Sequence, residues 1–365
     1  MKKEWKIIPN LYNAFISHNF PVALIQFVTQ RCNAKCPHCF VDFKTEKDEL
    51  KLDEIEKIAS STGSCLRNIS LTGGEPFIRD DLFEIANIWH TNSSTKSIVL
   101  TTNGSRPDRI EKFCNKAAKK EIPVSFFISY DFIGEIHSNY RGLKNLHQNL
   151  LESCKIIKSY NNKFNTTLQI TLTPDNVESA IETYNYMKDV LKIQNINCTL
   201  FRGEKADSLD KELRSKIITT YKEIQTKRNK DFENNHINGL NGDVLTSTLM
   251  NAKNKMLWKY VEKTFRTQKY ISPCSAGSLI GVIYHDGSVF PCEILNKEIG
   301  KLKDFNYNFI ECWHSKKAKQ IQKEIITSKC NCTHECFWLI NILSSPRYYG
   351  ELSYQIIRNL ARKNG

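Results

Sequence analysis

The sequence predicts an α/β fold built on parallel strands and followed by a small cysteine-rich domain. Short apolar runs rich in β-branched and aromatic residues alternate with amphipathic stretches through the first two-thirds of the 365 residues. Six of the 13 cysteines then fall within the last hundred residues. The alternation alone leaves open whether the strands close into a partial barrel or form a flat, doubly wound sheet.

Six strands are expected, each followed by a helix, because the apolar runs are short and the stretches between them have helical periodicity. The expected strands are residues 22–28, 68–71, 97–101, 124–129, 167–172 and 197–201. The expected helices are residues 52–59, 80–89, 107–120, 143–157, 177–191 and 208–228. The polar, asparagine-rich residues 231–243 predict a loop or domain boundary.

Composition indicates a globular protein, with 40% hydrophobic and 25% charged residues. The longest apolar run, residues 20–28, is too short to cross a bilayer, and no apolar segment typical of a signal peptide follows the first lysines. We therefore expect a cytoplasmic protein without membrane association. An odd number of cysteines in such a chain argues against a disulfide framework and indicates metal ligation or redox chemistry.

The net charge of +13, from 52 basic and 39 acidic residues, has two interpretations. It would suit an acidic or phosphorylated substrate, or an acidic electron-donor protein. We favour the simpler interpretation, lysines spread over solvated helix faces, because the basic residues form no dense block.

Three cysteines follow the first expected strand in the segment CNAKCPHCF. Cys32, Cys36 and Cys39 have the spacing C-x3-C-x2-C. Soft thiolates this close together suit an iron–sulfur cluster or zinc. Zinc would take His38 as its fourth ligand, but zinc sites usually draw ligands from two separated pairs, so the spacing favours a cluster. Three thiolates on a four-iron cluster leave one iron open to a small molecule.

Glycine-rich and polar motifs follow the next three expected strands. These are Gly73-Gly74-Glu75-Pro76, then Thr101-Thr102-Asn103-Gly104, then Ser129-Tyr130-Asp131 with Glu135, Ile136, His137 and Arg141 beyond. Glycine permits close approach of the backbone to a ligand, and the carboxyl ends of parallel strands meet at one edge of a sheet. We expect these motifs and the cysteine loop to form one site.

The cysteine spacing, with a ring residue before the last cysteine, resembles the signature of the radical S-adenosylmethionine (SAM) superfamily. The strand-end motifs resemble the GGEP, TNG and S-x-D…EIH…R segments of that family. The resemblance implies a partial (β/α)6 TIM-like barrel, a 4Fe-4S cluster on the three cysteines, and SAM cleavage to a 5′-deoxyadenosyl radical. The implied SAM-binding residues are His38, Gly73, Gly74, Glu75, Pro76, Thr102, Asn103, Ser129, Asp131 and Arg141.

A second cysteine group lies near the C-terminus. Cys274 and Cys292 have the spacing C-x12-G-x4-C around a predicted β-hairpin that turns at Asp286-Gly287, and this resembles the opening of SPASM and twitch auxiliary domains. Two of three further cysteines would complete a second 4Fe-4S cluster; these are Cys330, Cys332 and Cys336. Cys330 and Cys332 compete for one place, and a zinc site using His334 is the alternative. The other cysteines are expected in the core; they are Cys65, Cys114, Cys154, Cys198 and Cys312.

The expected organisation has five parts. They are an N-terminal extension (1–21), a radical SAM core (22–230), a linker and helical connection (231–270), an auxiliary cluster domain (271–345) and a C-terminal basic tail or helix (346–365). Only 31 residues precede Cys32, which leaves no room for a leader-peptide domain and disfavours peptide maturation without a partner.

The sequence thus predicts an oxidoreductase or related transformase acting on a small-molecule or peptide substrate. The auxiliary cluster would serve in electron transfer or substrate placement, and a reducing protein such as flavodoxin or ferredoxin would supply electrons. No nucleic acid partner is expected. Two alternatives are a non-catalytic zinc or iron–sulfur protein and an iron–sulfur electron carrier. The first explains the cysteines but not the motifs at successive strand ends, and the second needs neither a barrel nor an open iron.

Overall fold

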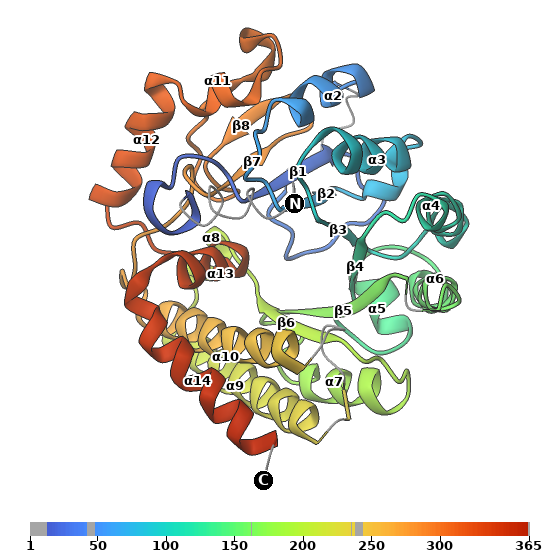
Figure 1. Cartoon of the computed structure of the whole chain (residues 1–365). Coiled ribbons are helices and arrows are strands. Elements are labelled where there is room, and N and C mark those ends of the chain that lie inside the picture. The colour runs from blue at the N-terminus through green and yellow to red at the C-terminus, as the bar shows by residue number, and fades with distance from the viewer. Residues whose placement is uncertain (1–12, 42–47, 162, 235, 238–243, 364–365) are drawn as a thin grey trace. The chain divides into compact units, whose positions relative to one another are not determined.

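The computed structural model describes residues 13–41, 48–161, 163–234, 236–237 and 244–363. The chain divides into two compact units, Met1–Thr167 with Ala276–Ile325, and Leu168–Ser275 with Ile326–Gly365. Strands and helices alternate along the chain and the strands of the core are parallel, which confirms the predicted α/β fold class (Figure 1). The finer division into five parts stays a prediction.

Four consecutive parallel strands form the core of the first unit. They are β1 (Ala23–Thr29), β2 (Asn68–Gly73), β3 (Ser97–Thr102) and β4 (Val124–Ser129), each paired with the next. Every residue of β1 is buried, as is typical of a central strand covered on both faces. Residues of β3 and β4 alternate between buried and half-buried. All four strands were predicted, with small differences at their ends.

Helices follow these strands as predicted. They are α2 (Leu52–Ser60), α3 (Leu82–Asn92), α4 (Pro107–Lys119) and α6 (Leu146–Lys158). The short α5 (Glu135–Tyr140) was not predicted. Its sequence lacks the usual helical pattern of buried apolar and exposed polar residues, because α5 buries His137 completely and leaves Ile136 62% exposed.

The predicted hairpin is confirmed in the first unit. β7 (Ile280–Ile283) pairs parallel with β1 and antiparallel with β8 (Ser288–Phe290), which in turn pairs with β9 (Gly300–Lys301). Gly287 makes the turn with a φ of +82°, a conformation that favours glycine. Short helical segments follow, namely η4 (Leu302–Phe305), α11 (Phe309–Trp313) and α12 (Lys316–Thr327).

The second unit combines a strand pair with long helices. β5 (Asn165–Leu172) pairs parallel with β6 (Ile196–Leu200) from Leu168 onward. The helices are α7 (Ala180–Asp189), α8 (Glu204–Asp207), α9 (Lys211–Glu233), α10 (Val244–Thr267), α13 (Glu335–Ser344) and α14 (Tyr349–Lys363). Helices α9, α10 and α14 run side by side, with α10 packed against both others (Figure 1).

The predicted loop at residues 231–243 begins too early. Helix α9 continues to Glu233, because Asp231 is held inside the unit by hydrogen bonds from Tyr184 Oη (2.8 Å) and Lys188 Nζ (2.9 Å). Residues 235 and 238–243 of that prediction lie outside the described residues.

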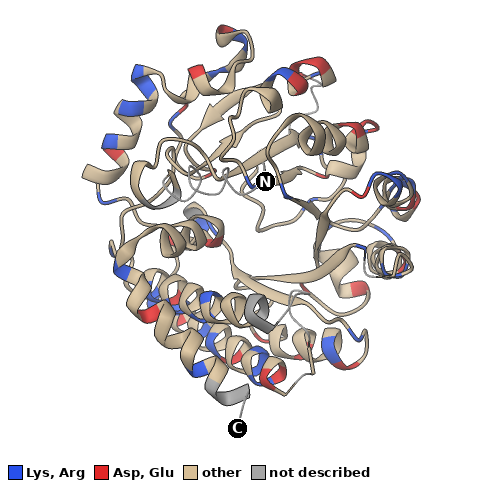
Figure 2. Ribbon diagram, in the orientation of Figure 1, with Lys and Arg blue, Asp and Glu red and all other residues tan. Residues whose placement is uncertain are grey.

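Charge is spread over the helices of both units. Figure 2 shows Lys and Arg on the outer helices, interleaved with Asp and Glu on α9, α10 and α14. This agrees with the interpretation of the net charge as solvated helix faces. Over the described residues, no helix combines the length and the apolar character that a membrane crossing requires.

We predict that Gln26→Leu destabilises the first unit by about 1–3 kcal/mol, because Gln26 Oε1 accepts a buried hydrogen bond from Trp89 Nε1 (2.6 Å) and its loss leaves the indole N–H unsatisfied. Chemical denaturation measures the change in the free energy of unfolding. The double variant Gln26→Leu with Trp89→Phe removes both partners and recovers much of the loss. Equal losses in the single and double variants would contradict the assignment.

Candidate functional site

The three clustered cysteines lie in the loop directly after β1. Each is half-buried, the Ala34 N–H donates to Cys32 Sγ (3.4 Å), and the Cys39 N–H donates to the carbonyl of Cys36 (3.1 Å). Burial raises the pKa of all three thiols, that of Cys32 to about 12. Thiolates in this loop therefore require a compensating positive charge, which a bound metal supplies.

Gly73 and Gly74 let the end of β2 lie directly on the base of the cysteine loop. The Gly74 N–H donates to the carbonyl of Thr29 (3.0 Å), and the Glu75 N–H donates to that of Arg31 (2.9 Å). A Cβ added to Gly73 would lie 2.2 Å from Thr29 O, and one added to Gly74 would lie 2.0 Å from Arg31 O. Only glycine permits this approach, so the glycine motif places the cysteine loop.

Glu75 joins the end of β2 to the end of β3. The residue is 1% exposed, and its carboxylate accepts hydrogen bonds from Thr102 Oγ1 (2.7 Å), Asn103 N (2.7 Å) and Phe77 N (3.1 Å). Burial raises the pKa of Glu75, and these donors partly offset the rise. Most of the hydrogen-bonding capacity of this carboxylate is therefore used within the protein.

Asn33 ties the cysteine loop to the segment after β3. Asn103 Nδ2 donates to Asn33 Oδ1 (3.0 Å), and Asn33 Nδ2 donates to Ser105 Oγ (2.9 Å). Sequence reasoning missed Asn33 and Ser105, although both stand inside or next to recognised motifs. The loop is thus hydrogen-bonded to two strand ends at once.

Asp131 and Arg141 form a buried ion pair at the end of β4. Arg141 Nε and Nη2 lie 2.9 and 2.6 Å from Asp131 Oδ2, and the carbonyl of Arg141 accepts from Lys35 N (2.8 Å). In this structure Arg141 therefore pairs with one of the protein's own carboxylates. The Arg141 charge also lowers the pKa of Cys36 and Cys39, although burial outweighs it.

His137 supports this ion pair as a neutral side chain. Its Nδ1 accepts a hydrogen bond from the Asp131 N–H (3.2 Å), and burial lowers the pKa of His137 to about 3. Ser129, the last residue of β4, is half-buried.

Tyr140, which the sequence did not single out, contacts the residue before the third cysteine. Its hydroxyl lies 3.0 Å from His38 Nδ1, and the two rings stack with centroids 5.5 Å apart. Phe132 packs edge-on against Tyr140 (4.7 Å between centroids). Helix α5 thereby orients His38.

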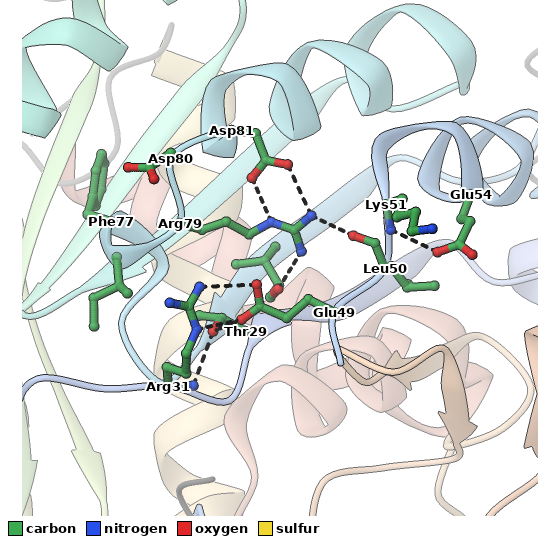
Figure 3. A network of polar contacts seen from close by, with 12 residues as sticks. Thr29, Arg31, Glu49, Leu50, Lys51, Glu54, Phe77, Arg79, Asp80 and Asp81 are labelled. Carbon is green, nitrogen blue, oxygen red and sulfur yellow. Dashed lines mark hydrogen bonds and ion pairs between the residues drawn. The ribbon is translucent and has the colours of Figure 1, made fainter. Parts of the chain in front are cut away.

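A polar network supports the strand that carries the loop (Figure 3). The Glu49 carboxylate binds the Arg31 guanidinium through two contacts (2.9 and 3.1 Å) and accepts from the Thr29 hydroxyl. Arg79 donates to the carbonyls of Val28 (2.8 Å) and Leu50. The end of β1 is therefore held by side chains that sequence reasoning did not identify.

The C-terminal cysteines divide between the units. Cys292 follows β8 in the first unit, whereas the others belong to the second, namely Cys274, Cys330, Cys332 and Cys336. The Leu295 N–H donates to Cys292 Sγ (3.2 Å), and Trp338 Nε1 donates to the carbonyl of Cys332 (2.8 Å). Cys312 is buried in the core as predicted, as are Cys65, Cys114 and Cys198, whereas Cys154 is half-buried.

Among the described residues, no three His, Cys, Asp or Glu side chains converge as a site for a single metal ion. The N-terminal cysteine loop nevertheless has the chemistry that an iron–sulfur cluster needs: three soft donors close in sequence, on a loop seated on glycine backbone. Which cysteines coordinate stays a prediction.

Comparison with known proteins identifies the part of the chain that carries the cysteine loop. Residues 27–187, which contain the cysteine loop and all three strand-end motifs, match the model of the Radical SAM superfamily. They form a radical SAM domain. The expected recognition is thereby confirmed, and the curated relatives of this domain are enzymes.

The similarity extends beyond the radical SAM domain. The chain is 23% identical over 325 residues to an AdoMet-dependent heme synthase of Methanosarcina barkeri, covering 86% of this chain and 88% of that enzyme. It is 30% identical over 199 residues to a GTP 3′,8-cyclase of Helicobacter pylori, covering 52% of this chain and 59% of that enzyme. The fold resembles that of anSMEcpe with bound AdoMet and Kp18Cys peptide (TM-score 0.61, 18% identity, 94% and 100% covered). It also resembles Streptococcus suis SuiB bound to S-adenosylmethionine (TM-score 0.55, 16% identity, 84% and 67% covered).

We predict that Gly74→Ala destabilises the radical SAM domain by about 1–3 kcal/mol and lowers its bound iron, because the new Cβ meets the Arg31 carbonyl. Thermal unfolding and iron content measure the two effects. Gly350→Ala is the matched control, since a Cβ there meets nothing within 4 Å. Iron content and stability equal to those of Gly350→Ala would show that the close approach is unimportant.

We predict that Asp131→Asn costs about 3 kcal/mol of stability, because it leaves the buried Arg141 guanidinium without its counter-charge. Asp108→Asn breaks the exposed Arg106–Asp108 pair and should cost at most about 1 kcal/mol. Urea unfolding of the two variants gives the comparison. Similar losses in both would rule out a special role for the buried pair.

Proposed function

We propose that this chain is a radical SAM enzyme whose Cys32, Cys36 and Cys39 hold a 4Fe-4S cluster and whose strand ends bind SAM. When bound, the cluster supplies the electron that cleaves SAM to methionine and a 5′-deoxyadenosyl radical, which takes a hydrogen atom from the substrate. The observation that carries the proposal is the seating of the cysteine loop on the Gly73-Gly74 backbone, within a domain that matches the superfamily.

The contacts of the strand-end residues sort them into two proposed roles. Glu75, Thr102 and Asn103 bond mainly to one another and to the cysteine loop, so we assign them to positioning that loop. Asp131 and Arg141 neutralise each other and place a positive group near Cys36 and Cys39.

Direct contact with SAM is then expected of groups whose hydrogen-bonding capacity is not already used within the protein. In the part of the chain that the structure describes, the half-buried Ser129 hydroxyl makes no hydrogen bond. We assign Ser129, the backbone of Gly73 and Gly74, the ring of His38 and the adjoining Pro76 to the SAM pocket. The Ser129 hydroxyl, at the end of β4, would be available to hydrogen-bond with a polar group of SAM.

We further propose an auxiliary 4Fe-4S cluster on Cys274, Cys292 and two of the three cysteines at 330, 332 and 336. Its support is the spacing of these cysteines together with the resemblance of the fold to anSMEcpe over 94% of this chain. Structures of anSMEcpe and SuiB contain bound peptides, and curated relatives are named for heme and GTP chemistry. We therefore propose a peptide or small-molecule substrate, a flavodoxin- or ferredoxin-like electron donor and a cytoplasmic location.

We predict that the anaerobically reconstituted chain holds about eight irons and releases 5′-deoxyadenosine from SAM under reductant, since each of two 4Fe-4S clusters contributes four. The variant Cys32→Ala, Cys36→Ala, Cys39→Ala should retain about four irons and release none. Cys65→Ala, at a buried cysteine outside both clusters, is the control and should match the wild type. Zinc without iron, or a cluster without SAM cleavage, would refute the proposed activity.

A further inference from the structure

The C-terminal end of helix α5 contacts both intervals between the three cysteines. In the first interval, the Lys35 N–H donates to the carbonyl of Arg141 (2.8 Å), and a Cβ added to Gly142 would lie 3.4 Å from Lys35 Cβ. In the second interval, the Tyr140 hydroxyl lies 3.0 Å from His38 Nδ1. All of these residues belong to the first unit. Consecutive residues at one helix end therefore act on both segments that join the cysteines.

This helix end is itself firmly held. The Arg141 guanidinium forms the buried ion pair with Asp131, and the two side chains are 7% and 0% exposed. The Arg141 N–H donates to the carbonyl of His137 (3.2 Å), and the His137 ring accepts from the Asp131 N–H (3.2 Å). A buried polar network that is joined in this way allows little movement. The end of α5 is therefore a fixed support for the residue beside Arg141, which is Tyr140.

The Tyr140 ring is restrained by two other rings. Phe132, 8% exposed, packs edge-on against it with an interplanar angle of 63°. The His38 ring stacks on it nearly in parallel, with an interplanar angle of 15°. Stacking alone would permit the imidazole to turn over about its Cβ–Cγ bond, because this torsion is roughly two-fold. The hydroxyl contact at Nδ1 distinguishes the two orientations, so it is the contact that selects one of them.

The orientation of His38 matters because of its position in the loop. His38 directly precedes Cys39, and its ring is assigned above to the SAM pocket. A side chain that is already held in the orientation a ligand needs loses less conformational freedom on binding. For one side chain this preorganisation corresponds to about two- to tenfold tighter binding.

We propose that Tyr140 is a positioning residue of the SAM site: its hydroxyl selects the orientation of the His38 ring and thereby strengthens SAM binding. The inference rests on the proposed function, in which the His38 ring borders SAM. Tyr140 acts through His38 and is not a catalytic residue. Its contribution is to affinity for SAM, and the loop keeps its cluster without it.

The test compares SAM binding by the reconstituted full chain and its Tyr140→Phe variant, which keeps the ring and removes only the hydroxyl. An EPR titration of the reduced cluster with SAM gives the dissociation constant, and 5′-deoxyadenosine release against SAM concentration gives kcat and KM. The dissociation constant and KM should both rise about two- to tenfold, whereas kcat and iron content stay at the wild-type values. Tyr354→Phe is the matched control, at a tyrosine of α14 that is 59% exposed, and should match the wild type.

A second background separates positioning through His38 from any other effect of the hydroxyl. His38→Phe keeps a ring before Cys39 but removes Nδ1, so the Tyr140 hydroxyl has no ring nitrogen to orient. Adding Tyr140→Phe to His38→Phe should therefore change the SAM dissociation constant by less than about twofold, because the two substitutions remove the same contact. Iron content and thermal unfolding of each variant show that the loop and the fold are intact.

The other outcomes decide against the proposal in distinguishable ways. A SAM-dependent spectrum in the wild type with the same dissociation constant in Tyr140→Phe would overturn the role of Tyr140 and leave the proposed function standing. No SAM-dependent change in the fully loaded wild type would refute the proposed function and this inference with it. Equal weakening by Tyr140→Phe in the wild-type and His38→Phe backgrounds would show that the hydroxyl acts by another route. Loss of iron in Tyr140→Phe would assign the hydroxyl to holding the cluster, which also overturns the proposal.

Discussion

The close approach of the Gly73-Gly74 backbone to the carbonyls of Thr29 and Arg31 is the constraint on which the site depends. It requires two residues without a Cβ at the end of β2, and it brings the first turn of the cysteine loop against the next strand. Glu75 then reaches the end of β3, and Asn33 reaches the same segment from the loop side. The positions of the three cysteines of the loop thus follow from backbone contacts between neighbouring parallel strands.

The polar residues of this site interact mainly with one another. Glu75 and Asp131 are both buried carboxylates, and each is compensated from within the protein, one by three donors and the other by a guanidinium. Such compensation is what makes buried charge tolerable, and it fixes geometry before any ligand binds. A preorganised loop suits a domain whose bound cofactor carries out the reaction while the protein provides placement.

Much of this could be predicted from the sequence. The first four strands were predicted because buried parallel strands are short, apolar and separated by amphipathic helices, and the cysteine, GGEP and TNG motifs all lie at their ends as expected. Helix α5 was missed because it exposes Ile136 and buries His137, the reverse of the usual pattern. Tyr140 was missed because its partner His38 lies 102 positions away, and spacing along the chain does not reveal a pairing of that kind. The burial of Lys253 on α10 could not be predicted either, because a lysine in an amphipathic helix is normally exposed.

The central claim is that Cys32, Cys36 and Cys39 hold a cluster with one iron open to SAM. EPR of the reduced, reconstituted chain before and after SAM addition tests it most directly, because a ligand on the open iron changes the spectrum of that cluster alone. The account predicts a spectral change on adding SAM to the wild type and none in the variant that lacks these three cysteines. An identical spectrum with and without SAM in a fully loaded wild-type protein would contradict it.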